Sequence, residues 1–428
     1  MSDLSKRDQK VVWHPFTQMK NAKLPIPIVR GKGALLYDEQ NNEYIDAVAS
    51  WWVNVHGHAH PYIQKKVSEQ LLTLEHTIFA GFTHPWAVEL AERILKINPA
   101  DHSKVFFSDN GSTAVEVGIK MALQYWWNKG VNKTKVIAFD NGYHGDTVGA
   151  MSVGGRGVFT APFDSIMFDV IHIDVPDGSN NSHVIQQFSE LVASGEVAAF
   201  IYEPMIQGAG GMIAYDMEGM NQLMKIARSN EVILIADEVM TGFGRTGKMF
   251  ASEYYEVMPD IMTLSKALTG GTMPLSLTTC KEYIFDNFIS EDKLKTFFHG
   301  HSYTGNPTAC SAALASLDLM ENPDFKDNIT RVHQQHQKFA TTLRSISNVK
   351  NIRLVGTIIA FDVITDEKDS YLNNIRDVLY DAFIAQRVIL RPLGNTVYIL
   401  PPYVITNDQL EKVYNVIIEV LSSIHNKG

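Results

Sequence analysis

The sequence predicts an α/β protein with a mostly parallel sheet flanked by helices, followed by a smaller α+β domain. Apolar, β-branched runs of five or six residues recur along the chain, and segments with helical periodicity lie between most of them. This alternation is typical of a doubly wound sheet whose strands are buried on both faces. Two of the runs end at charged residues, Asp237 and Lys266. Because ligands bind at the carboxyl ends of such strands, the pattern predicts a carboxylate and an amine at one ligand site.

The expected elements follow from hydrophobic periodicity, taken in chain order. Residues 1–10 are expected to be frayed, 31–46 to form a hairpin, and 61–97 to be helical with a break near Gly81 and Pro85. The strands of the main sheet are expected at 104–108, 135–139, 198–203, 232–237, 260–265 and 274–279. The helices near this sheet are expected at 111–127, 184–194, 217–230 and 307–320.

The C-terminal part has a different composition, since two amphipathic helices and short strands replace the regular alternation. Its strands are expected near 352–363 and 387–400, before a final helix from 407. We therefore predict three parts. They are an N-terminal segment at 1–49 that packs with the small domain, a large domain at 50–322, and a small C-terminal domain at 323–428.

Composition excludes several classes of protein. Asp and Glu outnumber Lys and Arg by 47 to 37, which gives a net charge of −10. The chain therefore lacks the excess of positive charge that attracts nucleic acid or an anionic membrane. No stretch approaches the roughly 18 apolar residues of a membrane span. The N-terminus is polar, without a signal peptide's apolar core. Cys280 and Cys310 are the only cysteines, so no disulfide framework is expected. These features predict a cytoplasmic protein that binds neither nucleic acid nor membranes.

A lysine and a carboxylate at one rim suit pyridoxal phosphate, which is held by a lysine and pairs its ring nitrogen with an acid. Gly111 and Ser112 open the helix predicted at 111–127, and a helix start of this kind is a seat for phosphate. Tyr143 follows the strand predicted at 135–139 and could stack on a cofactor ring. Each signal alone also has an ordinary explanation, as an ion pair, a helix cap or a core aromatic, so the combination carries the prediction.

Two other motifs point elsewhere and are set aside. Residues 242–249 nearly match a phosphate-binding P-loop, but Met249 stands where a hydroxyl must hold magnesium, and the acidic pair 237–238 precedes the loop. The three histidines at 56, 58 and 60 have no Cys, Asp or Glu nearby to complete a metal site. We therefore predict neither nucleotide hydrolysis nor a metal site.

Taken together, these stretches resemble the class III, fold-type I, pyridoxal-phosphate aminotransferases over nearly the whole chain. The family's cofactor-attachment signature is matched from Ile235-Ala-Asp-Glu-Val-Met-Thr-Gly-Phe-Gly-Arg-Thr-Gly247 to Ser265-Lys-Ala-Leu-Thr-Gly-Gly271. Within the family, Trp13-His-Pro-Phe-Thr17 and Ser50-Trp-Trp52 resemble the branch that aminates 8-amino-7-oxononanoate in biotin synthesis. So do Asn141-Gly-Tyr-His-Gly-Asp-Thr147, Gln207-Gly-Ala-Gly-Gly-Met212 and Leu400-Pro-Pro-Tyr403.

The resemblance implies roles for the cofactor-binding residues. Lys266 would bind the cofactor covalently and then move the proton between the substrate carbon and the cofactor. Asp237 would pair with the pyridine nitrogen, and Tyr143 and Val239 would enclose the ring from its two faces. Gly111 and Ser112 would hold the phosphate.

The resemblance also implies a homodimer with shared active sites. Ser302 would reach the phosphate from the partner subunit, and Gly300 would line the substrate site from the same loop. Arg391 would bind the substrate carboxylate. The substrate-binding wall would comprise Phe16, Trp51, Trp52 and Tyr398. The family usually has Tyr where this chain has Phe16, which leaves either S-adenosylmethionine, our preferred amino donor, or lysine.

The expected reaction is a two-step transamination of small molecules. The donor leaves its amino group on the cofactor, and 8-amino-7-oxononanoate then takes it to become 7,8-diaminononanoate. A general ω-amino acid:pyruvate aminotransferase and an aminomutase of the same fold are the alternatives.

Overall fold

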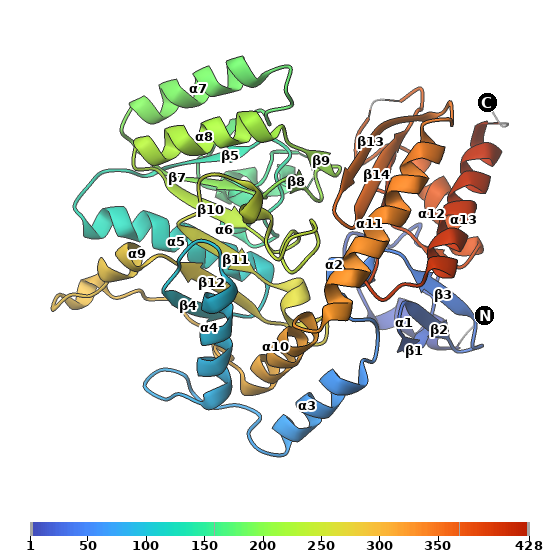
Figure 1. Cartoon of the computed structure of the whole chain (residues 1–428), viewed down its shortest axis with the longest axis horizontal. Helices are drawn as coiled ribbons and strands as arrows, with labels where there is room; N and C mark the ends of the chain where they lie inside the picture. Colours follow the sequence, from blue (N-terminus) through green and yellow to red (C-terminus); the bar gives the residue numbers. More distant parts are fainter. Residues whose placement is uncertain (1–2, 158, 368, 426–428) are drawn as a thin grey trace.

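The computed structural model describes residues 3–157, 159–367 and 369–425. A seven-stranded sheet lies in the middle of its larger part (Figure 1). The strand order is β4-β12-β11-β10-β7-β5-β6. β12 pairs antiparallel with both neighbours, and the other pairs are parallel, so the predicted mostly parallel sheet is confirmed. The strands are β4 (Lys104–Ser108), β5 (Lys135–Phe139), β6 (Ile171–Ile173), β7 (Val197–Tyr202), β10 (Ile233–Asp237), β11 (Ile261–Leu264) and β12 (Ser276–Cys280).

Helices cover both faces of this sheet. α5 (Gly111–Asn128) packs against β7, β10, β11 and β12 on one face, while α7 (Asn181–Ala193) and α8 (Met217–Ser229) cover the other (Figure 1). α5 begins where predicted because Asn110 caps it: its side chain accepts a hydrogen bond from the Thr113 amide at 3.1 Å. The remaining helices of this part are α3 (Pro61–Leu71), α4 (Pro85–Ile97), α6 (Val148–Val153), α9 (Glu282–Asp286) and α10 (Pro307–Met320).

The C-terminal part forms a separate group of strands and helices, which lies next to the N-terminal strands (Figure 1). Its sheet contains β13 (Val349–Val355), β14 (Ile358–Val363) and β16 (Thr396–Ile399), and its helices are α11 (Pro323–Leu343), α12 (Ile375–Ala385) and α13 (Asn407–His425). A separate sheet joins β1 (Ile28–Lys32), β2 (Leu35–Asp38) and β3 (Glu43–Asp46) to β15 (Val388–Ile389). The N-terminal strands thus share a sheet with the C-terminal part, and the domain boundaries stay a prediction.

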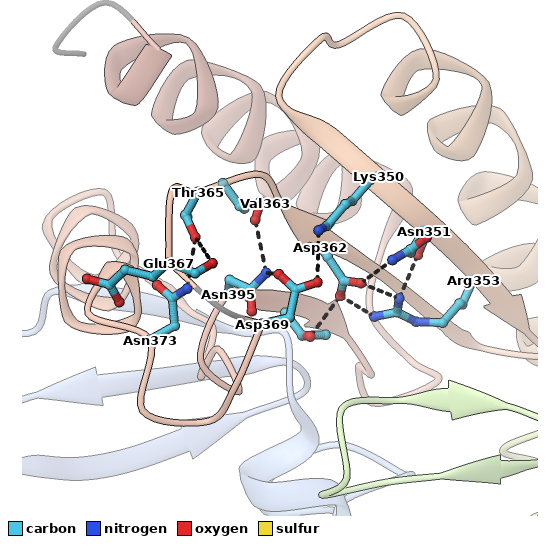
Figure 2. A network of polar contacts seen from close by, with 11 residues as sticks. Lys350, Asn351, Arg353, Asp362, Val363, Thr365, Glu367, Asp369, Asn373 and Asn395 are labelled. Atoms are coloured by element: carbon cyan, nitrogen blue, oxygen red, sulfur yellow. Dashed lines mark hydrogen bonds and ion pairs between the residues drawn. The ribbon is translucent and has the colours of Figure 1, made fainter. Parts of the chain in front are cut away.

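A polar network fixes the C-terminal sheet to a hairpin of the large part, β8 (Ile206–Gln207) and β9 (Ile213–Ala214). Arg353 of β13 bonds both carboxylate oxygens of Asp362 at 2.6 and 2.9 Å (Figure 2). The same guanidinium donates to the carbonyl of Gly211 at 3.2 Å, between the two hairpin strands. The bidentate pair holds Arg353 in one orientation, so the hairpin next to the large sheet is tied to β13.

Two details differ from the sequence prediction. Residues 3–11 form helix α1 (Asp3–Val11) rather than a frayed end, and Ser5 is buried there with its hydroxyl donating to the Pro25 carbonyl at 2.8 Å. Residues 1–2 lie outside the described part. A four-residue turn, α2 (Ala49–Trp52), precedes α3 at a position where the sequence analysis predicted no element.

Four short 3-10 helices, Ala161–Ile166, Ala251–Tyr254, Lys266–Thr269 and Lys293–Lys295, complete the described elements. Among the helices of the described ranges, none is long and apolar enough to cross a membrane.

Candidate active site

A cavity of about 400 Å³ lies at the carboxyl ends of β10 and β11. This is the rim at which open α/β sheets bind ligands. The cavity brings together residues that lie far apart in the sequence. The predicted site residues that line it are Trp52, Gly111, Ser112, Tyr143, Asp237, Val239 and Lys266.

Lys266 follows β11 after a single residue and points its amine across the cavity. Its Nζ lies 4.5 Å from the centroid of the Trp52 ring. Burial lowers the pKa of the Lys266 amine to about 8, although the charges of Asp237 and Glu203 act in the opposite direction. A larger fraction of this amine is therefore unprotonated near neutral pH, which is the form that attacks a carbonyl.

Asp237 is the last residue of β10, and its carboxylate is held by three polar groups: a backbone amide, a hydroxyl and a histidine ring. Its Oδ1 accepts bonds from the Val239 amide at 3.1 Å and the Thr263 hydroxyl at 3.3 Å. Its Oδ2 lies 2.7 Å from Nδ1 of His144, which is itself buried. Burial opposes a charge on this ring, but the bond to Asp237 and its charge raise the pKa of His144 overall. The contact with Asp237 therefore favours the charged form of His144.

Glu203 is a site residue that the sequence analysis missed. It follows β7 directly, lines the cavity, and is 5% exposed. Its carboxylate accepts bonds from the amides of Tyr143 at 3.1 Å and Gly208 at 2.8 Å. Burial raises the pKa of Glu203 to about 7, despite the nearby His144. A charged residue directly after a buried strand is the signal that identified Asp237, and it could have identified Glu203 too.

The start of α5 approaches Val239 closely because residue 111 is glycine. A Cβ at Gly111 would lie 2.7 Å from a methyl carbon of Val239, so a larger residue would collide with this side chain. The neighbouring Ser112 hydroxyl accepts a bond from the Asp146 amide at 3.2 Å, and the Tyr143 hydroxyl donates to Asp146 at 3.0 Å. These contacts place the helix start, Tyr143 and Val239 around one space.

The predicted substrate wall gathers beside the cavity. The Arg391 guanidinium lies 4.8 Å from the centroid of the Trp51 ring, and Phe16 meets the same ring edge-on at 5.5 Å. The Trp52 indole donates to the Tyr398 hydroxyl at 3.1 Å. Three separate segments of the chain thus form one aromatic surface, which also contains an arginine.

The two tryptophans lie in the turn α2, whose four residues have positive φ angles of 49, 46, 71 and 75°. None of them is glycine, and the left-handed conformation costs about 1–2 kcal/mol for each ordinary residue. Such strain persists only where the surroundings fix it, and it clusters at functional sites.

Six predicted residues do not line this cavity: Phe16, Trp51, Arg391 and Tyr398 belong to the wall beside it, whereas Gly300 and Ser302 lie on a separate loop. Both loop residues are exposed. The Ser302 carbonyl accepts a hydrogen bond from the ring of His76, which ties this loop to the segment around His76.

A family model described as aminotransferase class-III matches residues 16–421. The chain therefore belongs to the class III aminotransferases. Among curated relatives, the adenosylmethionine-8-amino-7-oxononanoate aminotransferase of Synechococcus elongatus is 45% identical over 421 residues, covering 96% of this chain and 99% of the relative. The protein of the same name from Staphylococcus aureus is 40% identical and covers 86% of this chain and 85% of its own.

Solved structures agree with this assignment. The aminotransferase of the same name from Methanocaldococcus jannaschii has a TM-score of 0.92 at 34% identity and covers 98% of both chains. The omega transaminase of Pseudomonas jessenii, in complex with PMP, has a TM-score of 0.92 at 28% identity and covers 99% of this chain and 98% of its own. These neighbours confirm the predicted fold-type I architecture.

Proposed function

We propose that this protein transfers an amino group from S-adenosylmethionine to 8-amino-7-oxononanoate, giving 7,8-diaminononanoate in biotin synthesis, with pyridoxal phosphate as cofactor. The observation that carries the proposal is the 45% identity to a relative of that name over nearly the whole of both chains. The aromatic wall around Arg391 supports it, since this wall contains the Trp51–Trp52 pair on which the sequence resemblance rests. The cytoplasmic location expected from the sequence is part of the same proposal.

The lining residues fit pyridoxal phosphate. When bound, this group supplies an electron sink that stabilises negative charge at the substrate carbon. Lys266 would hold it covalently and carry the proton to and from that carbon. Asp237, held in place by His144 at 2.7 Å, would hold the proton on the ring nitrogen. The amides and hydroxyl at the start of α5 would bind the phosphate, with Val239 and Tyr143 against the two faces of the ring.

The substrate side of the site supports an acidic substrate with an apolar chain. Arg391 would pair with its carboxylate, and Trp51, Trp52 and Tyr398 would exclude water from the chain. Phe16 makes this wall apolar where the family usually has a hydroxyl. An aromatic wall attracts cations and would accept the sulfonium of S-adenosylmethionine, although it would also accept the alkyl stem of lysine.

We infer that the protein works as a homodimer whose subunits share their sites. Large apolar side chains are exposed in the loop that carries Gly300 and Ser302 and in the segment 72–82, which the bond between His76 and Ser302 joins to it. They are Leu72, Ile78, Phe82, Phe298 and Tyr303, each more than 60% exposed in the single chain. A second copy of the chain would cover this surface and receive Gly300 and Ser302 in its cavity.

Two alternatives make different demands on the substrates. The solved omega transaminases match the fold as well as the oxononanoate enzyme does, so backbone similarity does not separate them. We would incubate the purified protein and cofactor with 8-amino-7-oxononanoate or pyruvate, each with isotopically labelled S-adenosylmethionine or lysine. Labelled 7,8-diaminononanoate supports the proposal. Labelled alanine alone indicates a general ω-aminotransferase, and rearrangement without uptake of label indicates an aminomutase.

A further inference from the structure

The turn α2 needs a stabilising partner because four successive non-glycine residues are left-handed there. Its backbone bonds run from the Trp52 amide to the Val48 carbonyl at 2.8 Å and from the Val53 amide to the Ala49 carbonyl at 2.9 Å. These bonds close the turn without favouring its hand, since a right-handed turn would form the same pairs. Contacts from outside the turn must therefore select the left-handed form.

Asp46 makes those contacts. Its side chain is fully buried at the end of β3, three residues before the turn. Oδ1 accepts bonds from the Val48 amide at 3.2 Å and the Ser50 amide at 3.0 Å. Oδ2 accepts the Ser50 hydroxyl at 2.8 Å. One carboxylate therefore holds both the residue before the turn and the turn's second residue.

His58 holds Asp46 in turn. Its Nε2 lies 2.8 Å from Oδ2 of Asp46, and its Nδ1 lies 3.1 Å from the side-chain amide of Asn54. The backbone of His58 is fixed by a two-way bridge to Gly33, with bonds of 2.7 and 3.3 Å. His58, one of the three histidines for which no metal site was predicted, thus serves as a partner for the buried carboxylate.

The same strand places the turn relative to the substrate arginine. Asp46 pairs with Ile389 of β15, and Arg391 follows two residues later. The turn then projects Trp51 against Arg391 and Trp52 against Lys266, at 4.8 and 4.5 Å from the ring centroids. Asp46 does not line the cavity, so it acts through the two tryptophans.

We propose that Asp46, supported by His58, is a positioning residue for the substrate wall: its carboxylate selects the left-handed turn that sets Trp51 and Trp52 against Arg391 and Lys266. The importance of this wall for substrate binding rests on the proposed function. The geometry of the turn does not, so it is tested separately.

The first experiment needs neither substrate nor cofactor. The chain has six tryptophans, so fluorotryptophan labelling gives six signals that single Trp→Phe variants can assign by fluorine NMR. Asp46→Asn should shift or broaden the signals of Trp51 and Trp52 and leave the other four in place. Unchanged signals for both residues would refute the positioning role, whatever the substrate proves to be.

Asp38 provides a matched control on the neighbouring strand. Its carboxylate is also buried and accepts bonds from the amides of Gln40 and Asn42 at 3.0 and 2.8 Å, but it holds the turn between β2 and β3. Asp38→Asn should leave the signals of Trp51 and Trp52 unchanged. If it moves them as Asp46→Asn does, the effect is general destabilisation and the proposal fails.

The second experiment measures kinetics and uses glycine to remove the strain. Asp46→Ala should raise the KM for 8-amino-7-oxononanoate by about tenfold or more, the effect of losing a hydrogen bond to a charged group, with a smaller change in kcat. Adding Ser50→Gly should recover part of this loss because glycine adopts positive φ freely, whereas adding Ser50→Ala should not. Equal behaviour of the two double variants, or a KM unchanged in Asp46→Ala, would overturn the proposal. If Asp46→Ala does not fold, the substitutions Ser50→Gly and Ser50→Ala are compared in the Asp46→Asn background.

Discussion

Oδ2 of Asp237 lies 2.7 Å from Nδ1 of His144, and neither side chain is more than 5% exposed. Burial opposes a charge on the His144 ring, but the hydrogen bond to Asp237 and the charge of Asp237 raise the pKa of His144 overall. The ring of His144 also fixes the direction in which β10 presents Asp237 to the cavity.

Replacing Asp237 by Asn removes this charge while the shape is kept. We expect Asp237→Asn to bind the cofactor but to lose at least about a hundredfold in kcat, because each 1.36 kcal/mol of lost stabilisation is a tenfold loss. Steady-state kinetics together with a cofactor absorbance titration measure both quantities. His144→Gln, which keeps the acid but removes its partner, should lose less. Near-normal turnover in Asp237→Asn would show that Asp237 is structural.

The lowered pKa of Lys266 predicts how the cofactor-free protein captures pyridoxal phosphate. Capture requires the free amine, so its rate should rise with pH around a midpoint of about 8 rather than the ordinary 10.5. Stopped-flow absorbance measures the rate, and borohydride trapping followed by peptide mapping should place the adduct on Lys266. Lys266→Ala should show neither adduct nor turnover, while Lys248→Ala serves as the control. An adduct on another lysine would contradict the assignment.

Glu203 predicts a pH dependence of stability. Its folded-state pKa of about 7 lies above the ordinary value of 4.5, so its stabilising contribution is complete below pH 4.5 and is lost as the pH rises through 7. The loss should reach about 3 kcal/mol at 1.36 kcal/mol for each pKa unit.

Glu203→Gln has no such titration. In urea unfolding of cofactor-free protein, its unfolding free energy relative to the unmodified chain should therefore increase between pH 4.5 and 8. Glu92→Gln, at an exposed position on α4, should show no such trend. A pH-independent difference for Glu203→Gln would mean that Glu203 stays charged in the folded protein.

Phe16 predicts the behaviour toward donors. With an apolar wall, S-adenosylmethionine should convert the bound cofactor to its amine form in a single turnover, which visible absorbance follows. Phe16→Tyr restores a hydroxyl beside Trp51, whose ring Phe16 contacts at 5.5 Å. A hydroxyl that can hydrogen-bond to one donor and not to the other changes the preference between donors. Rapid conversion by lysine and none by S-adenosylmethionine would assign lysine as the donor.

Shared sites predict complementation between two inactive variants. Lys266→Ala removes the lysine of one cavity, and Gly300→Trp blocks the cavity of the partner that receives this loop. A mixed dimer contains one site with both Lys266 and Gly300 intact, so activity should recover after subunit exchange, up to half that of the unmodified dimer. Subunit exchange is verified with tagged chains. Exchange without recovery would place the loop in its own subunit's site.

The sequence by itself determined the fold class and the chemical centre of the site. Asp237 and Lys266 were found because each closes a short apolar run of the sequence, and this pattern is contained in a few consecutive residues. The start of α5 was equally local, since the Gly-Ser-Thr stretch and the helical periodicity lie in one segment. An apolar run looks the same in either direction, so the antiparallel course of β12 was not readable from it.

Only the tertiary structure decided how distant segments act on one another. Helix α1 forms in a polar segment because Ser5 reaches Pro25, a contact that no local pattern encodes. Contacts between remote residues include the pairing of His144 with Asp237 and the approach of Phe16 to Trp51. The burial of Glu203 also depends on the packing of distant segments. The left-handed turn at Ala49–Trp52 is the clearest case, because its residues disfavour that conformation locally and the buried carboxylate of Asp46 selects it.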